Sequence, residues 1–321
     1  MSSAFEQNKK IGKGINIGNA LEAPHEGDWG LTIEKEYFTI IKKAGFSSVR
    51  IPIKWSAHSE KIFPFTISEL FFSRIDLVIQ QALDTKLIVI LNVHHFNELF
   101  RNPRKYKKKY FAMWKQISER YKNYSSNLFF ELLNEPSFRL TPKKWNLFLN
   151  EAISIVRTCN PNRIMLVGPA RWNNVEGLKK LKLPQASENL IVTFHYYKPF
   201  HFTHQGAEWV WFSNLFLGTK WTSTIKQKNK IDKHFKYVSD WALKNKVPIN
   251  LGEFGAYNKA DLGSRVLWTN HVARTAEKYN FSFIYWEFGY GFGAYDIKNK
   301  KWNEELLFSI IPKVQTGLSD V

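Results

Sequence analysis

The chain has 321 residues, of which 44% are hydrophobic and 16% aromatic, and no proline-, serine- or glycine-rich linker or internal repeat interrupts it. We therefore expect a single domain over residues 1–321, with its core at about 11–312. A formal charge of +18 favours association with polyanions in general. The densest basic run, residues 101–109, nevertheless carries no nucleic-acid-binding motif. We interpret the excess charge as a solvated, lysine-rich surface.

A lone cysteine, Cys159, excludes an intramolecular disulfide and a cysteine-based metal site. We expect it to be a small buried side chain near the end of a helix. The first residues contain no apolar run typical of a signal peptide, and the longest such run, residues 87–91, is too short to span a membrane. The expectation is a soluble, cytoplasmic monomer with no membrane partner; secretion would require a trimmed leader or an unconventional route.

Strand signals recur along the chain, each rich in Val, Ile, Leu and Phe without polar alternation, as in parallel strands covered on both faces. They lie at residues 15–17, 48–53, 87–93, 128–133, 163–167, 190–194, 247–251 and 281–285. Helical patterns lie between them. Residues 71–82 show one apolar face, and 141–157 show another at spacings 0, 3, 4, 7, 8 and 11, with Thr141 as the predicted N-cap and Pro142 at the first helical position.

Eight strands that alternate with helical segments predict an α/β fold, the eight-fold β/α barrel known as the TIM barrel. A doubly wound sheet would need a glycine-rich phosphate loop after its first strand. The glycines of residues 12–18 instead precede that strand or lie within it. In a barrel, functional side chains gather at the C-terminal ends of the strands, which is where polar residues follow the apolar runs in this sequence.

Two glutamates stand out because each follows an apolar run: Glu135 in Leu133-Asn134-Glu135-Pro136, and Glu253 after residues 247–251. We expect each to lie where a buried strand emerges into a loop. Two carboxylates at the ends of parallel strands are the groups needed to cleave a glycosidic bond by acid and nucleophile. Some of the 12 tryptophans would then line a cleft, because a flat apolar ring matches the C–H face of a sugar.

With these residues in view, the chain resembles glycoside hydrolase family 5, the cellulase and mannanase family, from about residue 14 to about 302. It is most similar to the bacterial single-domain endoglucanases. The resemblance rests on seven segments in order: GINIGNALEAP, SVRIPIKWS, VILNVHHF, FFELLNEP, TFHYYKPFHFTHQGAEW, NLGEFGAY and YWEFGYGFGAYD.

The resemblance implies that Glu135 is the general acid/base and Glu253 the nucleophile. It implies that Asn134 binds the sugar 2-hydroxyl and that Arg50 lies beneath the nucleophile. The other implied site residues form a hydrogen-bonding shell, an aromatic platform and a cleft lining, and they are His94, His195, Tyr197, Trp286, Asn19, Glu22, His95, Trp172, Trp209 and Glu287.

A retaining mechanism places the two carboxyls about 5–5.5 Å apart. Arg50 would keep Glu253 ionised, and the charge of Glu253 would keep Glu135 protonated. No metal or cofactor is expected. His94 and His95 are strand neighbours that face opposite sides, and a cluster of His195, His201 and His204 would require a loop to fold back.

The leading hypothesis is therefore a retaining endo-β-1,4-glucanase whose partner is a β-1,4-linked glucan or glucomannan. The alternatives are an endo-β-1,4-mannanase, or one enzyme with both activities, since the two substrates differ at the 2-hydroxyl. A non-catalytic glycan-binding barrel is disfavoured because both glutamates are present, and a polyanion-binding role rests on charge alone.

Overall fold

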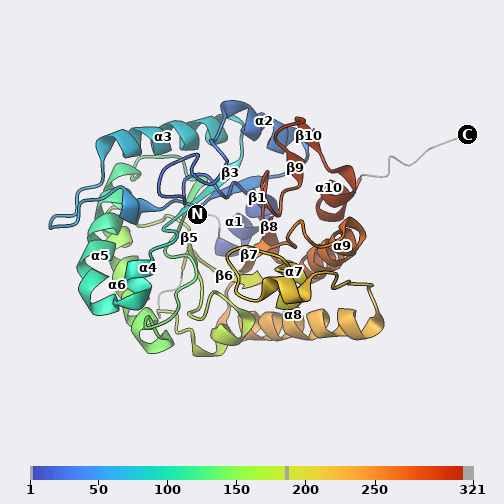
Figure 1. The fold of residues 1–321 in the computed structure, drawn as a ribbon. Helices are drawn as coiled ribbons and strands as arrows, with labels where there is room; N and C mark the ends of the chain where they lie inside the picture. Colours follow the sequence, from blue (N-terminus) through green and yellow to red (C-terminus); the bar gives the residue numbers. More distant parts are fainter. Residues whose placement is uncertain (1–2, 185–187, 314–321) are drawn as a thin grey trace, which may run out of the picture.

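The computed structural model describes residues 3–184 and 188–313, and eight parallel strands within them close into a barrel in chain order (Figure 1). The predicted α/β TIM-barrel fold is confirmed. The strands are β1 (Lys13–Asn16), β2 (Ser48–Ile51), β3 (Ile88–Asn92), β4 (Leu128–Glu131), β5 (Met165–Val167), β6 (Leu190–Tyr196), β7 (Ile249–Phe254) and β8 (Ser282–Tyr285).

All eight predicted strands overlap an observed one, but several of their C-terminal ends differ, and two of these differences concern the site. β4 ends at Glu131, before the predicted end at residue 133, and β7 continues through Phe254. The expectation that Glu253 follows its strand is therefore wrong. The ladder continues because Gly252 forms a bulge in β7: Phe194 pairs with Leu251 and His195 pairs with Glu253, so that the β6–β7 ladder runs on past the predicted end.

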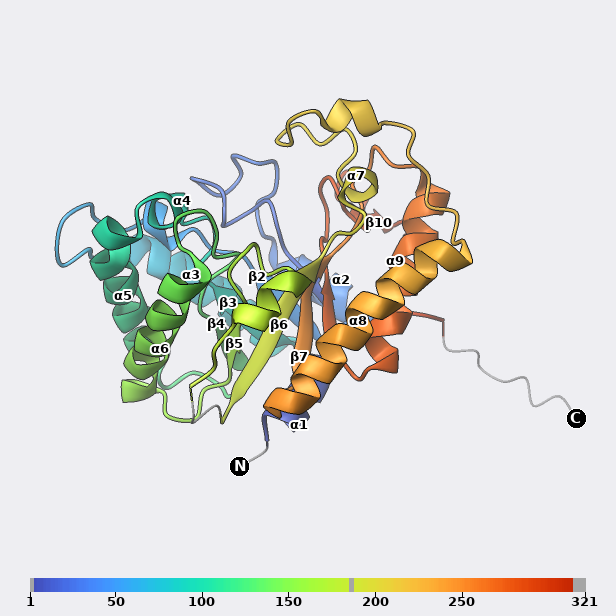
Figure 2. The ribbon, with the colours of Figure 1, turned by 90° about the horizontal axis from the view of Figure 1, so that it is seen from below.

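Helices surround the strands, as Figures 1 and 2 show from two directions. Around the barrel these are α2 (Lys35–Lys43), α3 (Glu69–Asp84), α5 (Pro103–Arg120), α6 (Pro142–Cys159), α8 (Ile225–Asn245), α9 (Leu262–Lys278) and α10 (Glu304–Ile310). The remaining elements are α1 (Ala4–Ile11), α4 (Asn97–Arg101), α7 (Phe200–Thr203), the 3-10 helices η1 (Trp55–Ala57), η2 (Val175–Lys180) and η3 (Ser213–Phe216), and the hairpin strands β9 (Tyr295–Asp296) and β10 (Lys301–Trp302).

The predicted helix at residues 141–157 is α6. Thr141 is its N-cap residue and Pro142 its first residue, and the apolar face that the spacing predicts is buried: Trp145, Phe148, Leu149, Ala152, Ile153 and Val156. The predicted apolar face of residues 71–82 is likewise the buried face of α3. Cys159 ends α6 but is only half-buried, because the neighbouring Asn160 rather than Cys159 takes the buried position at this end of the helix, so the expectation of a buried thiol is wrong.

Two apolar layers hold the barrel together. Inward-facing side chains such as Ile90, Phe129 and Leu166 fill its interior, and a larger cluster packs between the strands and the helices. Helix α1 closes the N-terminal end, where Asn8 Nδ2 donates to the Ile249 carbonyl at 2.9 Å and the Ser282 hydroxyl donates to Asn8 Oδ1 at 2.7 Å. The opposite, C-terminal end is the open one.

Within the described part of the chain, none of the helices has the length and apolarity that crossing a membrane would require.

Candidate active site

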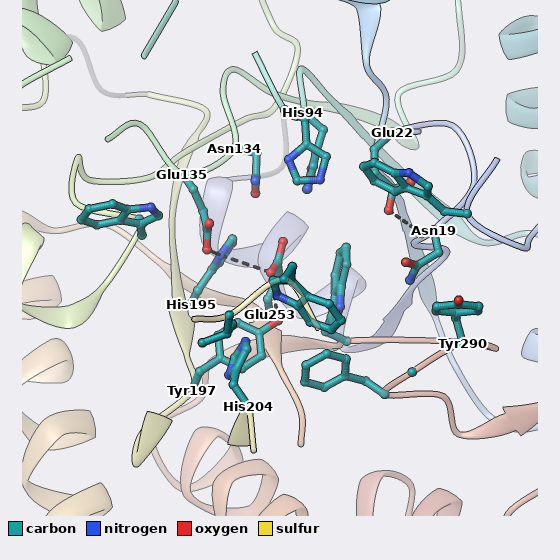
Figure 3. A pocket seen from close by; sticks show the side chains of 18 of the residues that line it. Asn19, Glu22, His94, Asn134, Glu135, His195, Tyr197, His204, Glu253 and Tyr290 are labelled. Carbon is teal, nitrogen blue, oxygen red and sulfur yellow. Dashed lines mark hydrogen bonds and ion pairs between the residues drawn. The ribbon is translucent and has the colours of Figure 1, made fainter. Parts of the chain in front are cut away.

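A cleft of about 1430 Å³ lies at the C-terminal end of the barrel, and Figure 3 shows side chains that line it. Most residues that the sequence singled out as a site lie on its walls: Asn19, Glu22, His94, His95, Asn134, Glu135, Trp172, His195, Tyr197, Trp209, Glu253 and Trp286. The loops and strand ends that carry them are far apart in the sequence, and barrel closure brings them together.

Glu135, on the loop after β4, and Glu253, on β7, face each other across the floor of the cleft (Figure 3). His195 joins them: its Nδ1 lies 2.8 Å from Glu135 Oε1 and 3.4 Å from Glu253 Oε2. One carboxylate oxygen from each glutamate and one ring nitrogen of His195 all lie within 4.8 Å of one another. This separation matches a carboxyl pair that acts on a single bond without an intervening water.

Several cleft residues have left-handed backbone conformations, which are uncommon for side chains other than glycine. They are Glu135 (φ 47°), His95 (φ 46°), Trp172 (φ 56°) and Asn19 (φ 61°). Such conformations persist where the surrounding structure enforces them, and they gather at functional sites. Here they turn side chains from the strand ends into the cleft.

Arg50, on β2, is fully buried beneath the two glutamates and uses all five of its N–H donors. Its Nε donates to Glu131 at 2.5 Å, and one Nη2 hydrogen donates to the other Glu131 oxygen at 2.9 Å. Three further bonds of 2.8 Å reach other side chains, which are Asn16 Oδ1, Glu253 Oε1 and Asn134 Oδ1. One guanidinium thus fixes groups from β1, β4 and β7 relative to β2.

The two glutamates differ in acidity. Burial raises the pKa of Glu135 to about 8, although its side chain keeps 26% of its surface exposed to the cleft. Arg50 lowers that pKa and Glu131 raises it. Repulsion between Glu135 and Glu253 also favours protonation of one member of the pair. Burial also raises the pKa of Glu253, but His195 and Arg50 oppose this effect. Glu253 therefore loses its proton more readily than Glu135.

The neighbours of the carboxyls are set in fixed orientations. The Tyr197 hydroxyl donates to Glu253 Oε2 at 3.0 Å. Burial lowers the pKa of His195 to about 4, so its ring is neutral at neutral pH. The His94 ring stacks on Trp286, with centroids 5.9 Å apart and planes inclined by 10°, and its Nδ1 lies 2.9 Å from the Asn92 side-chain amide.

The expectation that His94 and His95 face opposite sides is wrong, because the left-handed backbone of His95 turns its side chain into the cleft beside His94. Their rings are perpendicular, with centroids 4.5 Å apart. His204 stacks on Phe200 and meets the edge of Tyr197, while His201 contacts Phe216. Among the described residues, the group with spacing suited to a cation is Glu135, His195 and Glu253, the hydrogen-bonded trio described above.

Aromatic rings form much of the cleft wall. Trp172 meets the edge of Phe138, and Trp209 packs edge-on against Tyr257. Trp29, which the sequence did not single out, lines the cleft and contacts His95 with centroids 5.4 Å apart. Flat apolar walls with polar groups at the floor suit a polymer of pyranose rings.

Glu287 does not line the cleft as expected; it is fully buried behind it. Its carboxylate accepts from the backbone N–H groups of Gly289, Tyr290 and Phe292 at 3.0–3.4 Å, so it holds the loop whose residues 290–292 form a cleft wall. Burial raises its pKa to about 8. Glu287 is the second residue after β8, and Trp286 before it takes the position that faces the cleft.

Sequence reasoning missed Glu131 and Asn16, which hold Arg50. The available signal was a charged residue inside the apolar run Leu128–Glu131, since a carboxylate buried in a strand requires a cationic partner. It also missed Tyr290 and Glu208, which line the cleft from loops.

Two facing carboxyl groups in an aromatic-walled cleft at the C-terminal end of a β/α barrel define a protein built for glycoside cleavage. The family model for Cellulase (glycosyl hydrolase family 5) matches residues 9–291, and the chain belongs to this family. The family that the sequence motifs predicted is confirmed.

Similar proteins of known structure cover nearly the whole chain. A crystal structure of a hyperthermophilic endo-β-1,4-glucanase in complex with substrate superimposes with a TM-score of 0.96 and 52% identity over 97% of this chain and 100% of that one. Cel5A of Thermotoga maritima in complex with mannotriose superimposes with a TM-score of 0.95 and 50% identity over 96% and 100% of the two chains.

Endoglucanase H of Acetivibrio thermocellus is 34% identical over 295 residues, which are 91% of this chain and 31% of the relative. Cellulase/esterase CelE of the same organism is 29% identical over 90% of this chain and 37% of its own length. The chain thus spans about a third of the length of these two curated relatives.

Proposed function

We propose that this protein is a retaining endo-β-1,4-glucanase that hydrolyses internal bonds of β-1,4-linked glucans. The observation that carries the proposal is the facing pair Glu135 and Glu253, with oxygens within 4.8 Å and unlike surroundings. The named endoglucanase relatives support the substrate class.

In the first step Glu253, ionised beside Arg50, attacks the anomeric carbon. A bond forms between its carboxylate oxygen and that carbon, while the bond from the carbon to the leaving oxygen breaks. Glu135 gives its proton to the leaving oxygen, which departs as a sugar hydroxyl. The high pKa of Glu135 keeps this proton available at neutral pH.

In the second step Glu135, now a carboxylate, takes a proton from a water molecule that attacks the same carbon from the vacated side. The bond to Glu253 breaks and the original configuration at carbon is restored. His195 stays neutral in both steps, because burial lowers its pKa to about 4, so Arg50 is the cation that contacts Glu253.

Asn134 is suited to bind the sugar during both steps. Its Oδ1 accepts from Arg50 at 2.8 Å, which fixes the amide orientation and leaves Nδ2 to donate into the cleft. A donor placed at the 2-hydroxyl gains strength as positive charge develops at the neighbouring carbon, which lowers the barrier.

Both carboxyls, Arg50 and the cleft walls come from one chain, which supports the monomer as the active form and one catalytic domain over the described residues.

Mannan is the second candidate substrate. Thermotoga maritima Cel5A has been crystallised with cellobiose and with mannotriose, and it superimposes on this chain with a TM-score of 0.95 in each case.

The test is reducing-sugar release from carboxymethylcellulose, barley β-glucan, glucomannan and galactomannan, measured for wild type, Glu135→Gln and Glu253→Gln. Each substitution should reduce turnover by at least about 10³-fold. Glu151→Gln, on the outer face of α6 beside Lys107, is the matched control and should leave turnover unchanged.

Proton NMR of the first product should show the β-anomer, as retention requires. A first product with the α-configuration would refute the double displacement, and a Glu253→Gln enzyme as active as wild type would remove Glu253 as nucleophile. Release of reducing sugar from galactomannan would add mannanase activity to the proposal.

A further inference from the structure

The connection between β6 and α8 carries an unusual concentration of exposed apolar side chains. Residues 209–219 contain no charged side chain, in a chain of which 23% is charged. Figure 2 shows this connection as the yellow-to-gold segment that rises highest above the C-terminal end of the barrel. Trp211 is 83% exposed and Phe212 65%, and the other exposed apolar residues of the segment are Trp209, Leu215, Phe216 and Leu217.

Buried polar side chains give this segment a defined shape. Gln205 is fully buried; its Nε2 donates to the carbonyls of Phe202 and Thr219, and its Oε1 accepts from the Gly218 N–H at 2.9 Å. The buried Ser213 hydroxyl donates to the Ala207 carbonyl at 2.8 Å. The two limbs of the loop are therefore tied together, and the tip between them is held out in water.

The tip itself presents two aromatic rings. Phe212 has φ 61°, an uncommon conformation for an aromatic residue, and it precedes η3. Its ring lies 5.5 Å from that of Trp211, with planes inclined by 47°. A loop that holds large apolar rings in water through an unfavourable backbone conformation is organised to bind something there.

The tip is continuous with the cleft. Trp209 and Val210 line the cleft, and Trp211 and Phe212 are the next two residues. Trp209 is anchored by edge contacts with Tyr257 and His204, at centroid distances of 5.0 and 6.4 Å. A polymer that leaves the cleft along Trp209 meets the tip next.

We propose that Trp211 and Phe212 form an accessory binding site for the part of a single β-glucan chain that extends beyond the cleft. The site rests on the proposed glucanase function and adds to it a preference for long substrates. Exposed rings bind the C–H faces of sugars without excluding all water, and the fixed loop reduces the entropy lost on binding.

Other occupants fit less well. A stable contact with a second copy of the chain needs about 20–30 residues a side, far more than this tip provides. The surface of crystalline cellulose is flat and calls for coplanar rings, whereas these are inclined by 47°. A single soluble chain, which can twist from one ring to the next, suits the observed geometry.

The experiment compares wild type with the double variant Trp211→Ala/Phe212→Gly, in which glycine suits the positive φ at position 212. The control is Leu70→Ala, since Leu70 is 83% exposed on α3. We expect KM for polymeric barley β-glucan to rise by about tenfold in the double variant, with kcat unchanged. Both constants for cellotetraose, which is short enough to lie in the cleft, should stay within about twofold in every protein.

Equal KM values for the polymer in wild type and double variant would overturn the proposal, as would equal losses on polymer and cellotetraose. Sedimentation velocity and retention on microcrystalline cellulose complete the test. A dimer lost in the variant would assign the tip to self-association, and lost retention with unchanged polymer KM would assign it to crystalline surfaces; either result overturns the proposal.

Failure of the proposed function looks different, because wild type would then cleave neither substrate. If the double variant does not reach the thermal midpoint of wild type, Trp211→Ala alone gives the same comparison with one ring removed.

Discussion

Replacement of Arg50 by lysine tests how strongly one side chain supports the site. The substitution keeps the positive charge and the approximate length of the side chain. It changes the number and direction of donors, since a guanidinium has five N–H groups in a plane and an ammonium has three around a point. Arg50 uses all five, on Glu131, Asn16, Glu253 and Asn134.

At least two of the five hydrogen bonds must therefore be lost in Arg50→Lys. A buried hydrogen bond to a charged group contributes about 1.5–3 kcal/mol, so the expected loss in unfolding free energy is ~3–6 kcal/mol. This is a large part of the ~5–15 kcal/mol that stabilises an ordinary protein. Water cannot replace the lost donors, because Arg50 and Glu131 are fully buried.

The measurement is the free energy of unfolding from urea titration, together with kcat/KM on barley β-glucan. Arg74→Lys is the matched control: Arg74 also donates from two nitrogens, Nε and Nη2, to the two carboxylate oxygens of Glu26, each at 2.8 Å, but 27% of its side chain is exposed. The control should lose only about 1 kcal/mol. Equal and small losses in both variants would refute the reasoning from donor count and burial.

Three further predictions concern pH. Glu135, with its pKa raised to about 8 by burial, must be protonated to act as acid, so kcat/KM should fall as pH rises above about 8; a plateau to pH 10 would contradict this role. Tyr197→Phe removes the hydrogen bond to ionised Glu253, so the pKa of Glu253 should rise and the acidic limb of the kcat/KM profile should move to higher pH. An acidic limb that does not move would show that this hydrogen bond does not affect the pKa of Glu253. The folded-state pKa of Glu287, about 8, lies above its unfolded value near 4.3, so the native state binds more protons between these values and stability should fall as pH rises through this window. Glu287→Gln should flatten that fall in urea titrations at pH 5 and pH 8, and parallel slopes for variant and wild type would contradict it.

Elements with a repeating apolar pattern were predictable from the sequence. The buried face of α6 matches the spacing of its six apolar residues, and every strand was located by its β-branched and aromatic run. These patterns reflect the burial of one face along the whole length of an element, so many residues contribute to each prediction. The strand ends were less accurate, because the extension of β7 depends on the pairing of His195 with Glu253 beyond a bulge at Gly252, and the apolar run of β7 does not show that pairing.

The positions of Glu135 and Glu253 at one end of the barrel also followed from the sequence, since parallel strands place their C-terminal ends together. The partners of Arg50 did not. Asn16, Glu131 and Arg50 are separated by 34 and 81 residues, and only barrel closure shows that they meet. Glu287 was misplaced for a related reason: adjacent residues after a strand point to different sides, so Trp286 faces the cleft and Glu287 is buried behind it.

The five-fold use of Arg50 has a consequence for how this enzyme can be altered. Asn16 and Glu131 would serve the closure of the barrel in any case, yet they share their partner with Glu253 and Asn134. Rigidity of the scaffold and acidity of Glu253 are therefore coupled through Arg50, and we expect a substitution among these five residues to change both. Variation that adapts the enzyme to new substrates or conditions must begin farther out, at the cleft walls and the loops above them.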